Sequence, residues 1–141
     1  MIWSWPGQFR AGAAVDRVTS LLDVGPTLLD LAGAPMKNVA GRSLSRFLSG
    51  HGDVQGWPDD ALPECCGHRG AHPSRMLREG PWKLVFDIEH DAPAALYHLA
   101  DDLTEQKNLI GEAAQQDRVA RMEMLYREIR GSKRSTPVPG E

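Results

Sequence analysis

Residues 75–88 read RMLREGPWKLVFDI, and this stretch decides the fold. In its second half, the apolar residues that share one face are Trp82, Leu84, Phe86 and Ile88. This period of two is typical of a strand that is buried on one side. The Gly-Pro pair before the alternating run interrupts it and favours a turn. The sequence therefore predicts a β-hairpin over residues 75–88.

Two further elements are expected after the hairpin. Residues 95–99 (ALYHL) predict a third antiparallel strand, and residues 112–130 predict a long helix that ends at Gly131. The apolar stripe of this helix, at helical spacing, comprises Val119, Met122, Leu125, Tyr126 and Ile129. On its outer face, Glu123 and Arg127 are spaced as an i,i+4 ion pair. These elements predict a small antiparallel sheet packed against a long helix.

An earlier helix is predicted to end at Gly33, and its start has two interpretations. A capping box of Ser20 and Asp23 would put Pro26 inside the helix, where proline removes a hydrogen bond. With Asp23 as the N-cap, Pro26 falls in the first turn, where proline is tolerated. We favour Asp23, with a looser turn before it. A short strand is expected at residues 1–5.

The composition excludes several classes of protein. The 141 residues carry 16 Lys+Arg and 19 Asp+Glu, a net charge of -3, which gives no basic face for nucleic acid. No apolar run approaches the ~20 residues of a membrane span. The cysteines, Cys65 and Cys66, are neighbours and cannot staple distant parts of the chain. We expect neither nucleic acid nor a membrane as partner. The compartment stays open; no signal peptide is visible, which favours the cytoplasm.

Candidate chemistry concentrates in residues 64–72 (ECCGHRGAH). Cys66, His68 and His72 carry donors that zinc accepts, but no second ligand pair lies at a familiar spacing, so a loop with exposed histidines is favoured. A catalytic cysteine is favoured less, because nothing places a base beside Cys66. For the carboxylates at residues 101–102, a capped turn is favoured over an acid–base pair. We assign no catalytic residue and no metal ligand.

Three stretches, in this order, together resemble the C-terminal third of the sulfatase family, in the alkaline-phosphatase-like superfamily. The first runs from IWSWPG at 2–7 to DVGPTLLDLAG at 23–33, and the second is GRSL at 41–44. Together they are similar to the family's strand ending in WPG, the following helix and the GRSL after it.

The third stretch covers the predicted hairpin and the residues up to 109. REGPWK at 78–83, LYHLADD at 96–102 and EQKNL at 105–109 resemble the family's R-x-G-x-x-K hairpin and its L-Y-D-L-x-x-D-P-x-E-x-x-N-L ending. Leu103 stands where the family usually has proline, and His98 where aspartate is common. The segment before the hairpin is similar to the choline-sulfatase-like and arylsulfatase-like branches.

The resemblance implies sulfuric ester hydrolysis, with a formylglycine made from Cys or Ser in a C/S-x-P-x-R motif. It also implies a divalent cation, usually calcium, which stabilises charge on the sulfuryl oxygens. The sequence contains no such motif; residues 65–69 lack its proline. We expect the formylglycine and the calcium ligands in an N-terminal part of the fold, before Met1. We therefore carry over no catalytic residue and no metal ligand, and whether this chain is an enzyme by itself is left uncertain.

The resemblance implies an α/β fold that is α+β locally, in four segments. Residues 1–50 correspond to the terminal strand and helix of the sulfatase α/β domain, and 51–74 to a connecting loop. Residues 75–131 form the small C-terminal domain of antiparallel sheet and helix, and 132–141 a disordered tail.

The resemblance also implies site residues and partners. Candidates for shaping the mouth of the active site are loop residues Glu64, His68, Arg69 and His72. The expected partner is an N-terminal sulfatase portion, or a second copy held through apolar surface left exposed on the first strand and helix. A standalone, non-catalytic binding or interaction module is the alternative.

Overall fold

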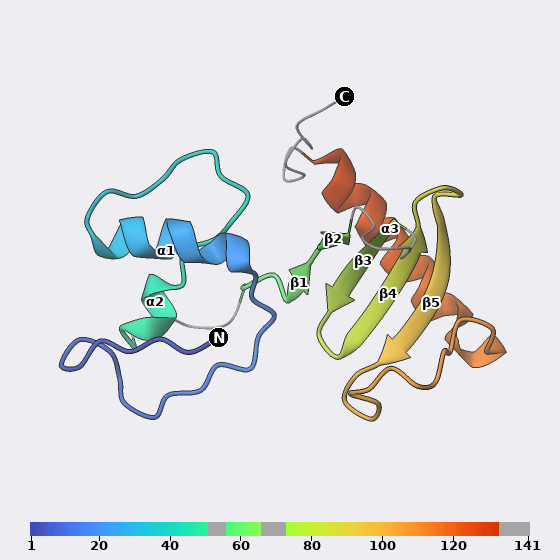
Figure 1. Ribbon diagram of the computed structural model, residues 1–141, viewed down its shortest axis with the longest axis horizontal. Coiled ribbons are helices and arrows are strands. Elements are labelled where there is room, and N and C mark those ends of the chain that lie inside the picture. Colours follow the sequence, from blue (N-terminus) through green and yellow to red (C-terminus); the bar gives the residue numbers. More distant parts are fainter. Residues whose placement is uncertain (51–55, 66–72, 133–141) are drawn as a thin grey trace. The chain divides into compact units, whose positions relative to one another are not determined.

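A computed structural model describes residues 1–50, 56–65 and 73–132 of the chain (Figure 1). It divides into two compact units, unit 1 (Met1–Pro58) and unit 2 (Asp59–Glu141). In these described ranges, no helix is both long enough and apolar enough to cross a membrane. The four predicted segments stay predictions, and we describe each unit by itself.

Unit 2 contains an antiparallel sheet. Its strands are β1 (Asp60–Ala61), β2 (Glu64–Cys65), β3 (Ser74–Glu79), β4 (Trp82–Asp87) and β5 (Ala92–His98). The order is β1-β3-β4-β5, and β2 also pairs with β3. β3 and β4 form the predicted hairpin, which turns at Gly80 with a φ of 51°. The third strand is confirmed, but it begins at Ala92 rather than at residue 95. Pro93 concealed this start; proline is tolerated there because β5 ends the strand order.

β1 and β2 lie where the sequence predicted only a connecting loop. Each pairs just two residues with β3, which is too short for an alternating pattern to show in the sequence. Two backbone hydrogen bonds extend the pairing: the Gly80 amide donates to the Asp59 carbonyl at 2.9 Å, and the Met76 amide to the Pro63 carbonyl at 3.0 Å. The loop thus contributes an edge to the sheet.

The predicted long helix packs on this sheet (Figure 1). A 3-10 turn, η2 (Ala113–Gln115), precedes α3 (Gln116–Gly131). The buried core comprises Leu77, Leu84, Phe86, Leu96, Val119, Met122 and Tyr126. The rings of Phe86 and Tyr126 stack with centroids 3.8 Å apart. Glu123 and Arg127 form the predicted ion pair at 2.6 Å. The predicted helix stripe and sheet face are confirmed, except that Ile88 lies beyond the end of β4.

Unit 1 consists of short helical segments and irregular chain. The segments are η1 (Leu21–Asp23), α1 (Val24–Leu31) and α2 (Ser45–Leu48). Residues 1–5 form no strand, because a strand requires a paired neighbour and the described residues of unit 1 contain none. Among its described aliphatic and aromatic residues, Leu44 alone is buried.

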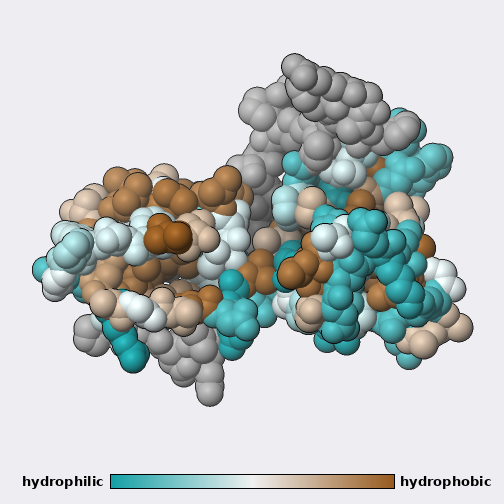
Figure 2. All heavy atoms as spheres, turned by 60° about the horizontal axis from the view of Figure 1, so that its bottom comes forward, coloured by the Kyte–Doolittle hydropathy of each residue, from teal (hydrophilic) through white to brown (hydrophobic). Residues whose placement is uncertain are grey.

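The exposed apolar side chains of the molecule gather on unit 1. Of the twelve large hydrophobic residues that are exposed within the described ranges, ten lie there: Met1, Ile2, Trp5, Val15, Leu21, Leu22, Leu28, Leu29, Met36 and Val39. In Figure 2, brown and tan atoms are frequent on unit 1, whereas the visible surface of unit 2 is largely teal. Among the described residues of unit 2, the two exposed large hydrophobics, Leu103 and Met124, are isolated in sequence. Unit 2 buries its apolar residues, and unit 1 does not.

We expect Met122→Ala to destabilise unit 2 by roughly 2–5 kcal/mol, because it leaves a cavity between α3 and the sheet. Met124→Ala is the matched control: the same substitution in the same helix, at a side chain that is 73% exposed, should change stability by less than about 0.5 kcal/mol. The change in the free energy of unfolding of each variant is measured by urea unfolding, with hydrogen exchange of the β4 amides as the probe of unit 2. Equal effects of the two variants would contradict this packing.

Candidate functional site

The residues predicted to shape an active-site mouth lie between positions 64 and 72 of the sequence. Glu64 lies in β2, is exposed, and accepts a hydrogen bond from the Arg75 guanidinium in an ion pair. His68, Arg69 and His72 lie outside the described residues, as does Cys66 of the zinc interpretation. The mouth assignment therefore stays a prediction.

One group of potential metal ligands occurs within the described ranges, at the turn after β4. Asp87, Glu89 and His90 offer ligand atoms within 4.8 Å of one another. The Nδ1 atom of His90 already lies 2.5 Å from Asp87, a contact that lowers the pKa of Asp87 and raises the pKa of His90. Calcium takes about six to eight oxygen ligands, so this exposed group does not fit it.

The adjacent carboxylates Asp101 and Asp102 have separate partners. Asp101 lies 2.5 Å from Nδ1 of His98. Asp102 accepts a hydrogen bond of 2.8 Å from the backbone amide of Lys107, and this bond is the main cause that lowers the pKa of Asp102. Both side chains hold the turn after β5, as the sequence favoured, and they do not form an acid–base pair.

The buried polar side chains of the described residues are Asp23 and Thr27, both in unit 1. The Asp23 carboxylate accepts hydrogen bonds from the backbone amides of Ser20 and Arg42, each 2.8 Å long. The Ser20 hydroxyl in turn accepts from the Leu22 amide, which completes a capping box on η1. Both interpretations of the helix start therefore hold in part: Ser20 caps η1, and α1 begins after Asp23 with Pro26 in its first turn.

The same face of α1 continues through Thr27 and Asp30. The Thr27 hydroxyl donates to the Asp23 carbonyl at 2.5 Å and accepts from the Leu44 amide at 2.9 Å. The Asp30 carboxylate accepts hydrogen bonds from the hydroxyls of Ser43, at 2.6 Å, and Ser45, and these bonds lower the pKa of Asp30. Three side chains at i, i+4 and i+7 thus hold the segment that contains GRSL.

Gly41, the first residue of GRSL, is required by a close approach of two backbones. A Cβ atom placed there would lie 1.9 Å from the carbonyl oxygen of Leu22 and 2.4 Å from its carbon. Backbone atoms cannot swing aside as a flexible side chain can, so any larger residue must push the segment away from η1. The neighbouring Arg42 stacks on Trp57 at 4.5 Å and donates to the Pro58 carbonyl at 2.7 Å.

In unit 2, the family-like motifs also make structural contacts. Lys83 lies 2.7 and 2.6 Å from the two carboxylate oxygens of Glu105. The Asn108 side chain accepts from the Leu96 and Ile110 amides, each at 3.0 Å, and the Leu109 amide donates to the Leu96 carbonyl at 2.8 Å. The segment after β5 therefore covers the free edge of that strand, which edge strands otherwise expose.

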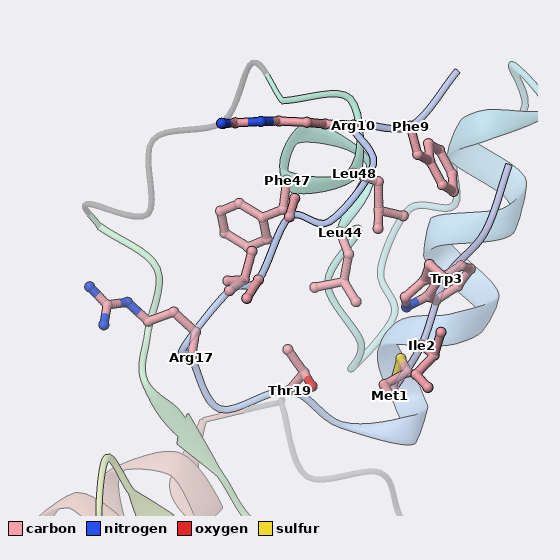
Figure 3. A pocket seen from close by; sticks show the side chains of 13 residues that line it. Met1, Ile2, Trp3, Phe9, Arg10, Arg17, Thr19, Leu44, Phe47 and Leu48 are labelled. Carbon is pink, nitrogen blue, oxygen red and sulfur yellow. The ribbon is translucent and has the colours of Figure 1, made fainter. Parts of the chain in front are cut away.

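Two cavities flank Trp3 in unit 1. One, of about 430 Å³, is lined mainly by apolar side chains that include Phe9, Leu44 and Phe47 (Figure 3). The other, of about 280 Å³, includes Trp5 and Leu28. The indole Nε1 of Trp3 is shielded from solvent and has no acceptor among the described residues. Leaving a buried donor of this kind unpaired costs roughly 1–3 kcal/mol.

Comparison with known proteins identifies relatives over nearly the whole chain. The family model described as N-sulphoglucosamine sulphohydrolase, C-terminal, matches residues 1–132. Arylsulfatase K of Xenopus laevis is 29% identical over 126 residues, which are 84% of this chain and 23% of that protein. The chain thus spans about a quarter of the length of this relative.

Solved structures give the same result. A 2-O GAG sulfatase superposes with a TM-score of 0.67 at 28% identity, over 85% of this chain and 27% of that one. The phosphonate monoester hydrolase of Agrobacterium radiobacter superposes with a TM-score of 0.60 at 29% identity, over 85% of this chain and 25% of that one. The resemblance read from the three sequence stretches is confirmed, and so is the fold class.

We expect Gly41→Ala to destabilise unit 1 by roughly 1–3 kcal/mol, because the added methyl overlaps the Leu22 carbonyl. Gly25→Ala in α1 is the control: a Cβ meets nothing there, so alanine should stabilise the helix by about 0.5–1 kcal/mol. Hydrogen exchange of the α1 amides reports both changes. Protection that falls equally in both variants would show that the close approach is not what matters.

We expect unit 1 to lose stability in acid through Asp30. The hydrogen bonds from Ser43 and Ser45 lower its folded pKa below 3.8, so its contribution is present above that value. The contribution is lost as the pH falls through the folded pKa. Asp30→Asn, which cannot ionise, should therefore show a flatter decline in α1 protection as the pH falls from about 5 through the folded pKa of Asp30. An unchanged acid slope in the variant would contradict this assignment.

Proposed function

The chain belongs to the family of N-sulphoglucosamine sulphohydrolase C-terminal regions, and on that premise we propose that it serves as the C-terminal part of a sulfuric ester hydrolase. The family match over residues 1–132 is the observation that carries this proposal. We propose no substrate narrower than a sulfuric ester, because the similar solved structures include both a 2-O GAG sulfatase and a phosphonate monoester hydrolase.

In this proposal the chain has a structural role, and the groups that react with the ester belong to the rest of the sulfatase. Sulfatases use calcium and formylglycine. The sequence contains no C/S-x-P-x-R motif, and the described residues offer no group of oxygen ligands that fits calcium. We therefore assign no step of hydrolysis to this chain's own residues. Their role is to fix the backbone around α1 and the sheet.

The partner in this proposal is a sulfatase portion that carries those groups. The relatives have about three quarters of their length outside the matched segment. The exposed apolar side chains of unit 1 support association, because a soluble protein rarely leaves so many together on its surface.

A standalone binding or interaction module remains the alternative function. The compact, well-packed core of unit 2 favours it, because such a core can fold without a partner. The two functions differ in what they predict for unit 1. A module should protect the α1 amides of the isolated chain as strongly as the β4 amides, whereas a dependent part should protect the α1 amides measurably less.

We expect the isolated chain to hydrolyse neither 4-nitrophenyl sulfate nor a phenyl phosphonate monoester, with or without added calcium. Two forms of Xenopus arylsulfatase K are compared: a fusion, in which residues 1–132 of this chain replace the matched segment, and a deletion form, which lacks that segment. The fusion should hydrolyse 4-nitrophenyl sulfate faster than the deletion form does. Hydrolysis of the phosphonate monoester by the same fusion shows whether any gain in activity is specific for the sulfate ester. Turnover by the isolated chain, or a fusion no more active than the deletion, would overturn the proposal.

A further inference from the structure

We propose that Asp87, Glu89 and His90, at the turn between β4 and β5, bind a divalent transition-metal ion of the zinc class. Each side chain offers one ligand atom, and the three atoms lie within 4.8 Å of one another. Within the described ranges, this is the one group of three or more such side chains. The proposal concerns unit 2 alone, and it does not depend on the proposed function.

The hairpin holds the backbone of the three ligands in place (Figure 1). Asp87 is the last residue of β4, and it pairs with Ser74 of β3 on one side and with Ala92 of β5 on the other. Glu89 and His90 follow within the turn, and the Glu89 amide donates to the Asp87 carboxylate at 2.8 Å. Ligands carried by the end of a paired strand are positioned more precisely than ligands on a long loop.

Asp91, the next residue, secures the turn to α3. Its carboxylate accepts hydrogen bonds from Arg130, at 2.9 Å, and from the Tyr126 hydroxyl, at 3.4 Å. Arg127 lies 3.6 Å from its other oxygen. The turn is thus held through Asp91, whose charge these arginines balance. The three proposed ligands remain accessible: one is half-buried and the other two are exposed.

The donor set determines the class of ion. It combines one imidazole nitrogen with two carboxylates, and imidazole suits zinc and its neighbours, whereas calcium and magnesium prefer oxygen ligands alone. Zinc binds nitrogen and oxygen at about 2.0–2.2 Å, usually with four ligands, so that its ligand atoms lie about 3.4 Å apart. The three side chains would occupy three positions, and a water molecule would occupy the fourth.

Only small movements of side chains are needed to admit the ion. The Nδ1 atom of His90 lies 2.5 Å from the Asp87 carboxylate, so these two groups already converge and must separate by about 1 Å. The His90 side chain is 74% exposed, which leaves it room to rotate. Zinc takes the place of the proton between the two groups, because it binds a neutral imidazole and an ionised carboxylate.

The test is a calorimetric titration of the full chain with zinc chloride. Residues 64–72 contain further donors, so the background variant combines Cys65→Ser, Cys66→Ser, His68→Ala and His72→Ala. Because the contact with Asp87 raises the pKa of His90, the titration is made at about pH 7.5 or above. The background variant should bind one zinc ion per chain. A background variant that binds no zinc would overturn the proposal.

In this background, His90→Asn and Glu89→Gln should each weaken zinc binding by at least about tenfold. Each removes a ligand, and even a residue that only orients a ligand is worth about 10–100-fold in metal affinity. The matched control is His98→Asn. His98 makes the same contact, with Nδ1 2.5 Å from Asp101, but no third candidate ligand joins them among the described residues. The control should change zinc affinity by less than about twofold.

Hydrogen exchange locates the ion and checks the fold. Zinc should slow the exchange of the amides at residues 88–92, and without zinc both ligand variants should leave the protection of the β4 amides unchanged. Equal losses of affinity in His90→Asn and His98→Asn would overturn the proposal, and so would protection by zinc that appears away from the turn. Displacement of zinc by an equal concentration of calcium chloride would contradict the assignment to a transition metal.

Discussion

The buried carboxylate of Asp23 organises unit 1, and the arrangement of its GRSL segment depends on it. Its two oxygens bind the backbone amides of Ser20 and Arg42, which lie before and well after α1 in the sequence. Burying a carboxylate is costly unless hydrogen bonds replace its water, and bonds to a charged acceptor are roughly twice as strong as neutral ones. Thr27 and Asp30 extend the same polar face. The polar face of α1 and the GRSL segment are joined by hydrogen bonds. The large apolar side chains of unit 1 do not form this contact, and most of them lie on its surface.

Unit 2 is built in the opposite way. Its buried side chains are apolar, with the Phe86–Tyr126 stack at the centre, and its polar motif residues hold the periphery. The Lys83–Glu105 pair and the Asn108 amide fasten the chain after β5 to the sheet. A unit that buries its apolar surface gains the main favourable term of folding from its own residues. The two units therefore differ in where their apolar side chains lie: unit 2 buries a contiguous core, and unit 1 exposes most of its large apolar residues.

The elements that could be predicted from the sequence are those whose signal is periodic. Trp82, Leu84 and Phe86 alternate because one side of β4 is buried, and the stripe of α3 repeats for the same reason. Contacts between distant residues leave no such signal: nothing near Asp23 or Gly41 shows that the Arg42 amide or the Leu22 carbonyl will lie beside them. The strand expected at residues 1–5 did not form, because pairing is a property of two strands and the pattern reports one. Likewise, the lack of a formylglycine motif is visible in the sequence, but the shielded indole N–H of Trp3, which has no acceptor among the described residues, is not.

The residues that make this chain recognisable form contacts that hold its backbone in place. Gly41 permits a close approach, Asp23 binds amides, and Asn108 covers a strand edge. A 2-O GAG sulfatase and a phosphonate monoester hydrolase both match the same segment at similar identity, although their names specify different esters. A segment that is retained between such proteins cannot by itself distinguish a sulfate from a phosphonate. The determinants of substrate choice must therefore be sought in side chains outside these motifs, and the motifs themselves are best understood as the means by which α1, the GRSL segment and the sheet are each held in shape.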